Sequence, residues 1–296
     1  MSQSHYQRLI EFVARKAGAL LMPTAARLHE EEVASGAFGA DGNLPETIRV
    51  EDRGADTTIF SFSSAGFLHS GLPTFAFEGL FNRQPRSYNL VFLRDIHRLA
   101  YHLTPDGKPT GLAYYESEVR DIMGRLGARR NLAIGESSGA AAALHFGTCC
   151  QMDQVICFAI PYPVTVWTSP SSILRTLTNF PELIRDPPGY WDALMITSFS
   201  ILAEATLKQK LGPDGIFDPP RTYLEAKNRP ELTLVFGQRC HPDASIAARL
   251  KPLPEVKLRP LPTGRHILWV PIARMGSLER LIMDEIEGGE VPPPGA

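Results

Sequence analysis

The sequence is poor in the features that mark secreted, metal-binding and membrane proteins. It has 4 cysteines in 296 residues, and their spacing matches neither a metal site nor a disulfide framework. We therefore expect Cys149, Cys150 and Cys157 to be buried free thiols, whereas Cys240 could be exposed. No metal ion is expected.

Long apolar runs and segregated charges are also missing. The charge-free apolar stretch of residues 193–203 is too short to cross a bilayer. The first residues have no signal-peptide design, so we expect a cytoplasmic protein. The formal net charge is −2 and no block of basic residues stands out, which argues against nucleic acid as a partner.

What the sequence does have is an alternation of short apolar runs and helical patterns. A hydrophobic fraction of 44% and a charged fraction of 21% suit a globular protein with a large core. Strands are predicted over 47–51, 56–62, 89–93, 130–134, 154–160, 231–237 and 256–261, and helices over 111–126 and 244–250. Nearly continuous apolar strands that alternate with helices predict an α/β fold with a mostly parallel sheet covered on both faces.

The most informative segment is 131–144, which reads as a strand, a sharp turn and a helix. The turn is Gly135-Glu136-Ser137-Ser138-Gly139, the G-x-S-x-G pattern of a nucleophile elbow. The two glycines leave room where a β-carbon would meet the neighbouring strand or helix. Ser137 is therefore the candidate nucleophile, and the alternative is a plain glycine-rich turn of an open α/β sheet.

An acid and a histidine follow in a matching order. Asp243 lies in the predicted loop 238–243, after one strand, and His266 follows the turn 262–265, after the next strand. The loops at the carboxyl ends of parallel strands open at the same edge of a sheet. Ser137, Asp243 and His266 can therefore meet there.

These residues resemble the pattern of the α/β-hydrolase superfamily, over roughly residues 48–286. The Gly-Glu-Ser-Ser-Gly turn is similar to the elbows of carboxylesterases, whereas the His-Gly-Gly-Gly motif of hormone-sensitive-lipase-like esterases is missing. The resemblance implies an α/β-hydrolase fold with a helical cap insertion and a catalytic triad of Ser137, His266 and Asp243. Such chemistry needs no metal and no organic cofactor.

Each member of the triad has an expected role. His266 would take the proton of Ser137 as its hydroxyl attacks a carbonyl, and Asp243 would hold the imidazole and stabilise its charged form. The backbone N–H of Ser138 would donate to the oxyanion. A second donor is expected from the loop 63–66, and Ser64 and Ala65 are the candidates.

Other polar residues compete for these roles. His241 lies in the acid loop but precedes Asp243, which breaks the expected order, and Asp218 is a weaker alternative acid. Glu136 is expected to be a buried, hydrogen-bonded carboxylate. Arg94 ends a predicted strand, where it would bind a substrate carboxylate or phosphate, or form a structural ion pair with Asp95 or another acid.

The long segment between the strands 154–160 and 231–237 is punctuated by prolines and rich in aromatic residues. A structureless loop of that length is improbable, so we expect a helical cap over 164–229. Its Trp167, Trp191 and Phe199 would line an apolar acyl pocket, or would simply pack the cap onto the body.

The expected organisation has four parts. A helical extension and loop occupy 1–46, the hydrolase core 47–163 and 230–287, the cap 164–229, and a disordered tail 288–296. The extension could cover the sheet, form a homodimer contact or add to the cap. The expected activity is that of a serine hydrolase on a small-molecule ester or thioester; the alternatives are an acyltransferase in a biosynthetic pathway and a non-catalytic binding or scaffold protein.

Overall fold

The computed structural model describes residues 46–65, 75–84, 88–268, 272 and 278–288. The expected N-terminal helix and the tail after Gly288 lie outside the described residues. Within them, no helix is long and apolar enough to span a lipid bilayer.

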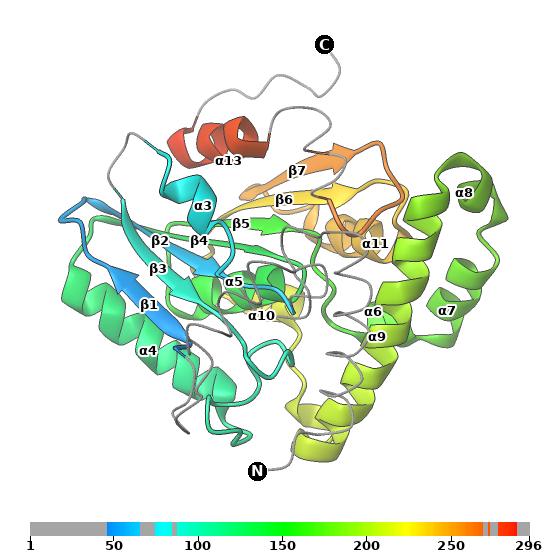
Figure 1. Cartoon of the computed structure of the whole chain (residues 1–296), viewed down its shortest axis with the longest axis horizontal. Coiled ribbons are helices and arrows are strands. Elements are labelled where there is room, and N and C mark those ends of the chain that lie inside the picture. The colour runs from blue at the N-terminus through cyan, green and yellow to red at the C-terminus, as the bar shows by residue number, and fades with distance from the viewer. Residues whose placement is uncertain (1–45, 66–74, 85–87, 269–271, 273–277, 289–296) are drawn as a thin grey trace, which may run out of the picture.

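A single sheet of mostly parallel strands forms the centre of the described fold (Figure 1). Its strands are β1 (Ile48–Glu51), β2 (Thr57–Phe62), β3 (Asn89–Leu93), β4 (Arg130–Glu136), β5 (Gln154–Phe158), β6 (Glu231–Gly237) and β7 (Val256–Leu261). They are ordered β1-β3-β2-β4-β5-β6-β7, with β1 antiparallel to β3 and all other neighbours parallel. The predicted fold class is confirmed.

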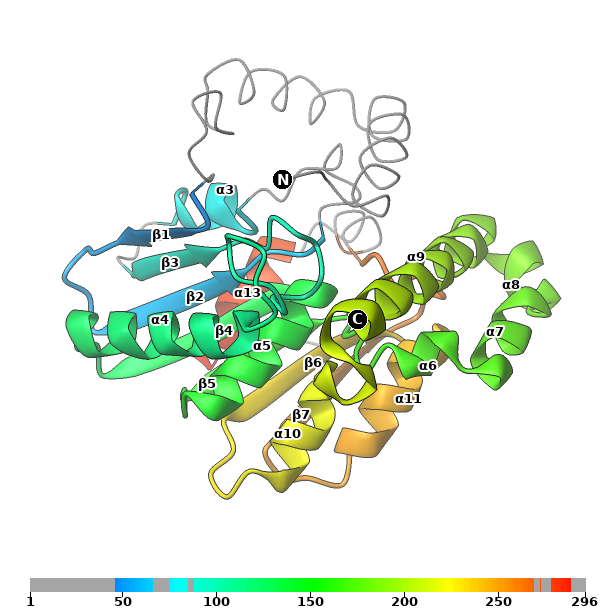
Figure 2. The same ribbon diagram turned by 90° about the horizontal axis from the view of Figure 1, so that it is seen from below.

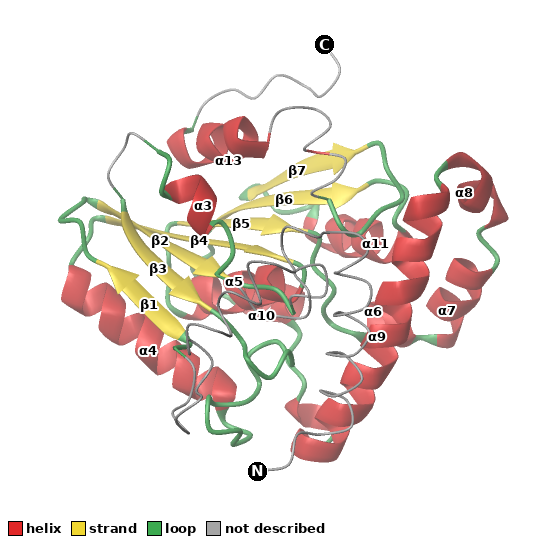
Figure 3. Cartoon of the chain, viewed as in Figure 1, coloured by secondary structure: helices red, strands yellow, loops and turns green. Residues whose placement is uncertain are grey.

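Helices cover both faces of the sheet (Figures 2 and 3). One face carries α4 (Gly111–Leu126), α5 (Ser138–Cys149), α10 (Pro219–Glu225) and α11 (His241–Leu250); the other carries α3 (Glu78–Phe81) and α13 (Leu278–Glu287). Successive residues of one strand serve the two cores, as Ile59 and Phe60 of β2 show. Burial on both faces is the physical reason for the continuous apolar runs in the sequence.

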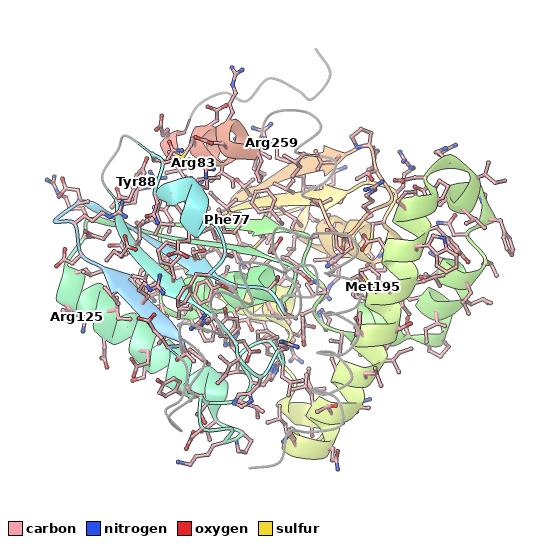
Figure 4. All side chains as sticks on the ribbon, viewed as in Figure 1. Phe77, Arg83, Tyr88, Arg125, Met195 and Arg259 are labelled. Atoms are coloured by element: carbon pink, nitrogen blue, oxygen red, sulfur yellow. The ribbon has the colours of Figure 1, made fainter. Side chains whose placement is uncertain are left out.

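Helix α13 is attached to the sheet by charge as well as by apolar packing. Glu285 is 3% exposed and receives Lys257 Nζ and Arg259 Nε of β7, each at 2.9 Å. Arg259 is labelled beside α13 in Figure 4. A buried carboxylate is tolerated when cations and hydrogen bonds compensate its lost hydration, as they do here.

The predicted cap segment is helical. After β5 come α6 (Thr165–Thr168), α7 (Pro170–Leu177), α8 (Phe180–Arg185) and α9 (Pro187–Leu211), followed by a short 3-10 turn, η1 (Pro213–Gly215). We call α6 to α9 the cap helices. They lie beyond the carboxyl ends of β5, β6 and β7 (Figure 1). Helix α10, within the same predicted segment, packs against α5 of the body instead.

Prolines stand in the first turns of α7, α8 and α9 and do not break these helices. Pro170 and Pro187 each stand in the first turn, where a missing backbone N–H has no cost. The preceding residues cap these helices, because Ser169 accepts from the N–H of Ser172 and Asp186 from that of Gly189.

Candidate active site

The nucleophile elbow has the strained geometry that its sequence predicts. Ser137 stands between β4 and α5 with φ 48° and ψ −124°, a left-handed conformation unusual for a residue with a β-carbon. A β-carbon on Gly135 would collide with the backbone of Gly139, and one on Gly139 with the carbonyl of Phe62. The requirement for both glycines is therefore confirmed.

The structure brings Ser137, His266 and Asp243 together. Ser137 Oγ lies 3.0 Å from His266 Nε2, and His266 Nδ1 lies 2.9 and 3.2 Å from the two carboxylate oxygens of Asp243. An ionised carboxylate only accepts hydrogen bonds, so Nδ1 carries the hydrogen and Nε2 accepts from the serine. This is the tautomer that a general base needs.

The acid differs from its prediction in local structure. Asp243 lies in the first turn of α11, not in a loop, because the helix begins at His241 with Pro242 as its second residue. The prolyl ring suits a first helical turn, and an acidic residue there is favoured by the helix dipole. The carboxylate is 1% exposed and reaches the imidazole from this turn.

Carboxylates dominate the electrostatics of the site. Burial alone would lower the pKa of His266, but the negative charges of Asp243, Asp192 and Glu136 outweigh it and raise this pKa above 6.5. Burial raises the pKa of Glu136 to about 7, although the Ser64 hydroxyl donates to its Oε1 at 3.0 Å. The carboxylates therefore stabilise the imidazolium that forms when His266 takes a proton.

A small pocket opens at Ser137. Ala65 and Ser138 line it near the nucleophile, and Ile196, Phe199 and Ala203 of α9 line it from the cap. Two candidate oxyanion donors thus lie at the pocket, whereas the Ser64 side chain is engaged with Glu136. The wall that α9 supplies is largely apolar.

The two cap tryptophans predicted for the acyl pocket, Trp167 and Trp191, are not among the described residues that line it. Trp167 is fully buried, and its ring meets the His266 ring edge to face, with centroids 5.1 Å apart. Trp167 belongs to a small apolar cluster with Ile196 and Cys240, and Met195 of α9, labelled in Figure 4, packs against this cluster. Trp191 is 63% exposed. Its neighbour on α9, Asp192, is buried, and successive helical positions lie about 100° apart, so Trp191 is on a different side of the helix.

Arginine reaches this pocket from a different position than the one predicted. Arg94 Nε donates to the carbonyl of Glu46, and its guanidinium lies over the ring of Phe75. Arg98 is instead the one charged side chain among the described residues that line the pocket. Sequence patterns missed it, because it stands in an irregular loop without periodicity.

That loop is held by Asp95. Its carboxylate accepts backbone N–H groups of His97, Leu99 and Tyr101 at 2.6 to 3.0 Å. The backbone is left-handed at Arg98, with φ 58°. Asp95 therefore acts as a local scaffold for the segment that presents Arg98, a role that no pattern in the sequence signals.

The competing acid and base have structural partners. His241 Nε2 faces the guanidinium of Arg175 on α7. Asp218 caps α10 by accepting from the N–H of Arg221 at 3.0 Å, and it pairs with Arg249 at 3.6 Å. Neither residue is among the described ones that line the Ser137 pocket.

The prediction of an exposed Cys240 is wrong, because the side chain is packed under the cap and only 2% exposed. Its sulfur and ligand atoms of Asp243 and His266 lie within 4.8 Å of one another, close enough for a metal ion. Burial raises the pKa of this thiol far above its usual range, whereas a metal ligand must be a thiolate. His266 and Asp243 bond to each other, so the group fits a hydrogen-bonded triad better than a metal site.

Comparisons with known proteins give a fold. No protein-family model matches the sequence, and no curated protein matches it significantly. Among solved structures, MenH from S. aureus superimposes with a TM-score of 0.51 at 11% identity, covering 82% of this chain and 98% of that one. The capsule O-acetyltransferase of Neisseria meningitidis serogroup A gives a TM-score of 0.50 at 15% identity, covering 81% and 91%. With this likeness, its strand order and its elbow, the chain has the α/β-hydrolase fold.

Proposed function

We propose that this protein is a serine hydrolase that cleaves an ester or thioester through a covalent acyl-enzyme on Ser137. The observation that carries the proposal is the hydrogen-bonded chain from Ser137 through His266 to Asp243, with the serine at a strained elbow. Strain of this kind is kept where the surrounding structure has a use for it.

The geometry supports a two-step reaction. Ser137 Oγ attacks the acyl carbonyl while its proton passes to His266 Nε2, and the backbone N–H groups of Ser138 and Ala65 donate hydrogen bonds to the oxyanion. The C–O or C–S bond to the leaving group breaks, and the leaving group takes the proton from His266. A water molecule then attacks the acyl carbonyl while its proton passes to His266; the bond from the acyl carbon to Ser137 Oγ breaks, the acid leaves, and His266 returns the proton to Ser137 Oγ.

The pocket indicates an acyl group with an apolar portion. Phe199 and Ala203 of α9 line the same pocket as Ser137, and an apolar wall there would limit the access of water to the acyl-enzyme. An acyltransferase would use the same residues, with an alcohol or amine in place of water. The likeness to an O-acetyltransferase is one of fold and does not favour this alternative over hydrolysis.

A fluorophosphonate probe tests the proposal without knowledge of the substrate. The wild-type protein should be labelled on Ser137, as peptide mass spectrometry would show, and Ser137→Ala should not react. Esters and thioesters of increasing acyl length, with and without an added alcohol, then separate hydrolysis from transfer. An unlabelled, folded wild-type protein would support the non-catalytic binding protein instead.

A further inference from the structure

The cap contributes a carboxylate to the loop that carries the histidine. Asp192 lies on α9, one turn before Ile196, and is 8% exposed. Its Oδ2 accepts the backbone N–H of His266 at 2.6 Å and that of Ile267 at 2.8 Å. Two consecutive N–H groups of the base loop therefore depend on one cap side chain.

This clamp matters because the loop has little regular structure of its own. His266 follows β7 and must place its two ring nitrogens at Ser137 and Asp243 simultaneously. The loop residues before it are tied by Thr263 and Arg265 to Asp186, also at the start of α9. The orientation of the imidazole is thus set partly from the cap.

The burial of the Asp192 carboxylate also lowers the stability of the fold. Its second oxygen, Oδ1, is buried and has no hydrogen-bond partner among the described residues. A buried, half-satisfied carboxylate destabilises a fold, so its presence calls for a compensating use. The nearby imidazole offers one, since a positive charge on the ring is attracted to the carboxylate most strongly where water is excluded.

We propose that Asp192 is a positioning residue for His266. It holds the loop so that the imidazole spans Ser137 and Asp243, and its charge stabilises the imidazolium that forms as Ser137 attacks. This inference rests on the proposed function. Its consequence is that docking of α9 is coupled to the reactivity of the base.

Several other groups act on the same imidazole. Asp243 of α11 and Glu136 of β4 also contribute negative charge, and burial keeps the nearby Cys240 thiol neutral. Arg265 is the adjacent cation, and it is paired with Asp186 at 3.3 Å. An experiment on Asp192 must therefore separate its effect on the imidazole from a general loosening of the cap.

The variant Asp192→Asn makes this separation, because the amide oxygen still accepts N–H groups but has no negative charge. We measure the rate of Ser137 labelling by the fluorophosphonate across pH. Labelling needs a neutral imidazole, so the rate rises with pH through the pKa of His266. The variant should shift this rise to lower pH and lower the plateau rate by about ten-fold. Asp192→Ser is a second uncharged acceptor, should the amide prevent folding.

The matched control is Asp186→Asn, which removes a carboxylate that also ties α9 to the base loop but is not directed at the imidazole. It should lower the melting temperature while the pH of half-maximal labelling stays at the wild-type value. An unchanged midpoint in both Asp192 variants, or an equal shift in Asp186→Asn, overturns the proposal. An NMR titration of the His266 ring measures the same midpoint even if the probe does not react, so failure of the proposed function is distinguished from failure of this inference.

Discussion

The nucleophile and its base are placed by two different means. Ser137 is held within the five-residue turn 135–139, where close backbone contacts at Gly135 and Gly139 restrict the conformation of the chain. Its N–H also donates a hydrogen bond to the carbonyl of Phe158. His266 is held by side chains 23 and 74 positions away, Asp243 and Asp192. The comparison teaches that the nucleophile is secured by local sterics, whereas the base depends on how α11 and α9 pack. Substitutions in the two regions should therefore have different effects on activity, stability and pH dependence.

The largest expected effect is the loss of chemistry without loss of fold. Ser137→Ala and His266→Ala should each lower turnover by about 10³-fold or more, because the hydroxyl and its base act as a unit. The double variant should be little worse than either single one. Turnover on the best ester of the panel and thermal unfolding are the measurements. If His241→Ala removed activity and His266→Ala did not, the base would have to be reassigned.

A larger residue at a glycine of the nucleophile elbow should disrupt the elbow by steric collision. In Gly139→Ala the added methyl meets the Phe62 carbonyl of β2, so the elbow must shift. We expect a loss of about 2–3 kcal/mol in the free energy of unfolding, together with loss of Ser137 labelling. Gly124→Ala in α4 is the matched control, since nothing lies within 4 Å of its added methyl. It should stabilise the protein by up to about 1 kcal/mol. Equal denaturation midpoints for the two variants would contradict the steric account.

The carboxylates around His266 should affect how the rate of Ser137 labelling depends on pH. The net effect of its neighbours raises the pKa of His266 above 6.5, so half-maximal labelling should occur above that pH and the rate should rise with pH. The stability that the charged imidazole contributes is present below the pKa of the unfolded chain. It is lost as pH rises through the folded value. A rate that stays constant from acidic to alkaline pH would argue against a histidine base.

The smallest effects should separate two aromatic residues of the cap. Phe199→Ala enlarges the pocket at Ser137 and should shift the ratio of kcat/KM toward bulkier acyl groups by about ten-fold. Trp191→Ala changes a side chain that is 63% exposed, so unfolding free energy should move by less than about 0.5 kcal/mol and the acyl preference should stay. If Trp191→Ala shifted the acyl-group preference and Phe199→Ala did not, Trp191 rather than Phe199 would have to be assigned to the substrate pocket.

Prediction from the sequence succeeded where the signal is local and periodic. The bounds of β3, β6, β7 and α4 match those predicted, because a continuous apolar run or a helical stripe reports burial directly. Prediction from the sequence failed where the direction of a side chain determines whether it reaches the pocket. Arg94 and Arg98 are only four residues apart, yet Arg94 is held by the carbonyl of Glu46 and the ring of Phe75, whereas Asp95 holds the loop that brings Arg98 to the pocket. Trp191 was misplaced because a helix of nearly uniform apolarity does not show which face is covered.

The sequence by itself determined the sheet, the elbow and the order of the three candidate residues. Steric exclusion at Gly135 and Gly139 acts between near neighbours, so it can be recognised from a short motif. Only the tertiary structure decided that Asp192 clamps the base loop and that Cys240 is buried beneath the cap. These features depend on the angle at which α9 crosses the strand ends. That angle results from packing among residues far apart in the chain, and no local pattern encodes it.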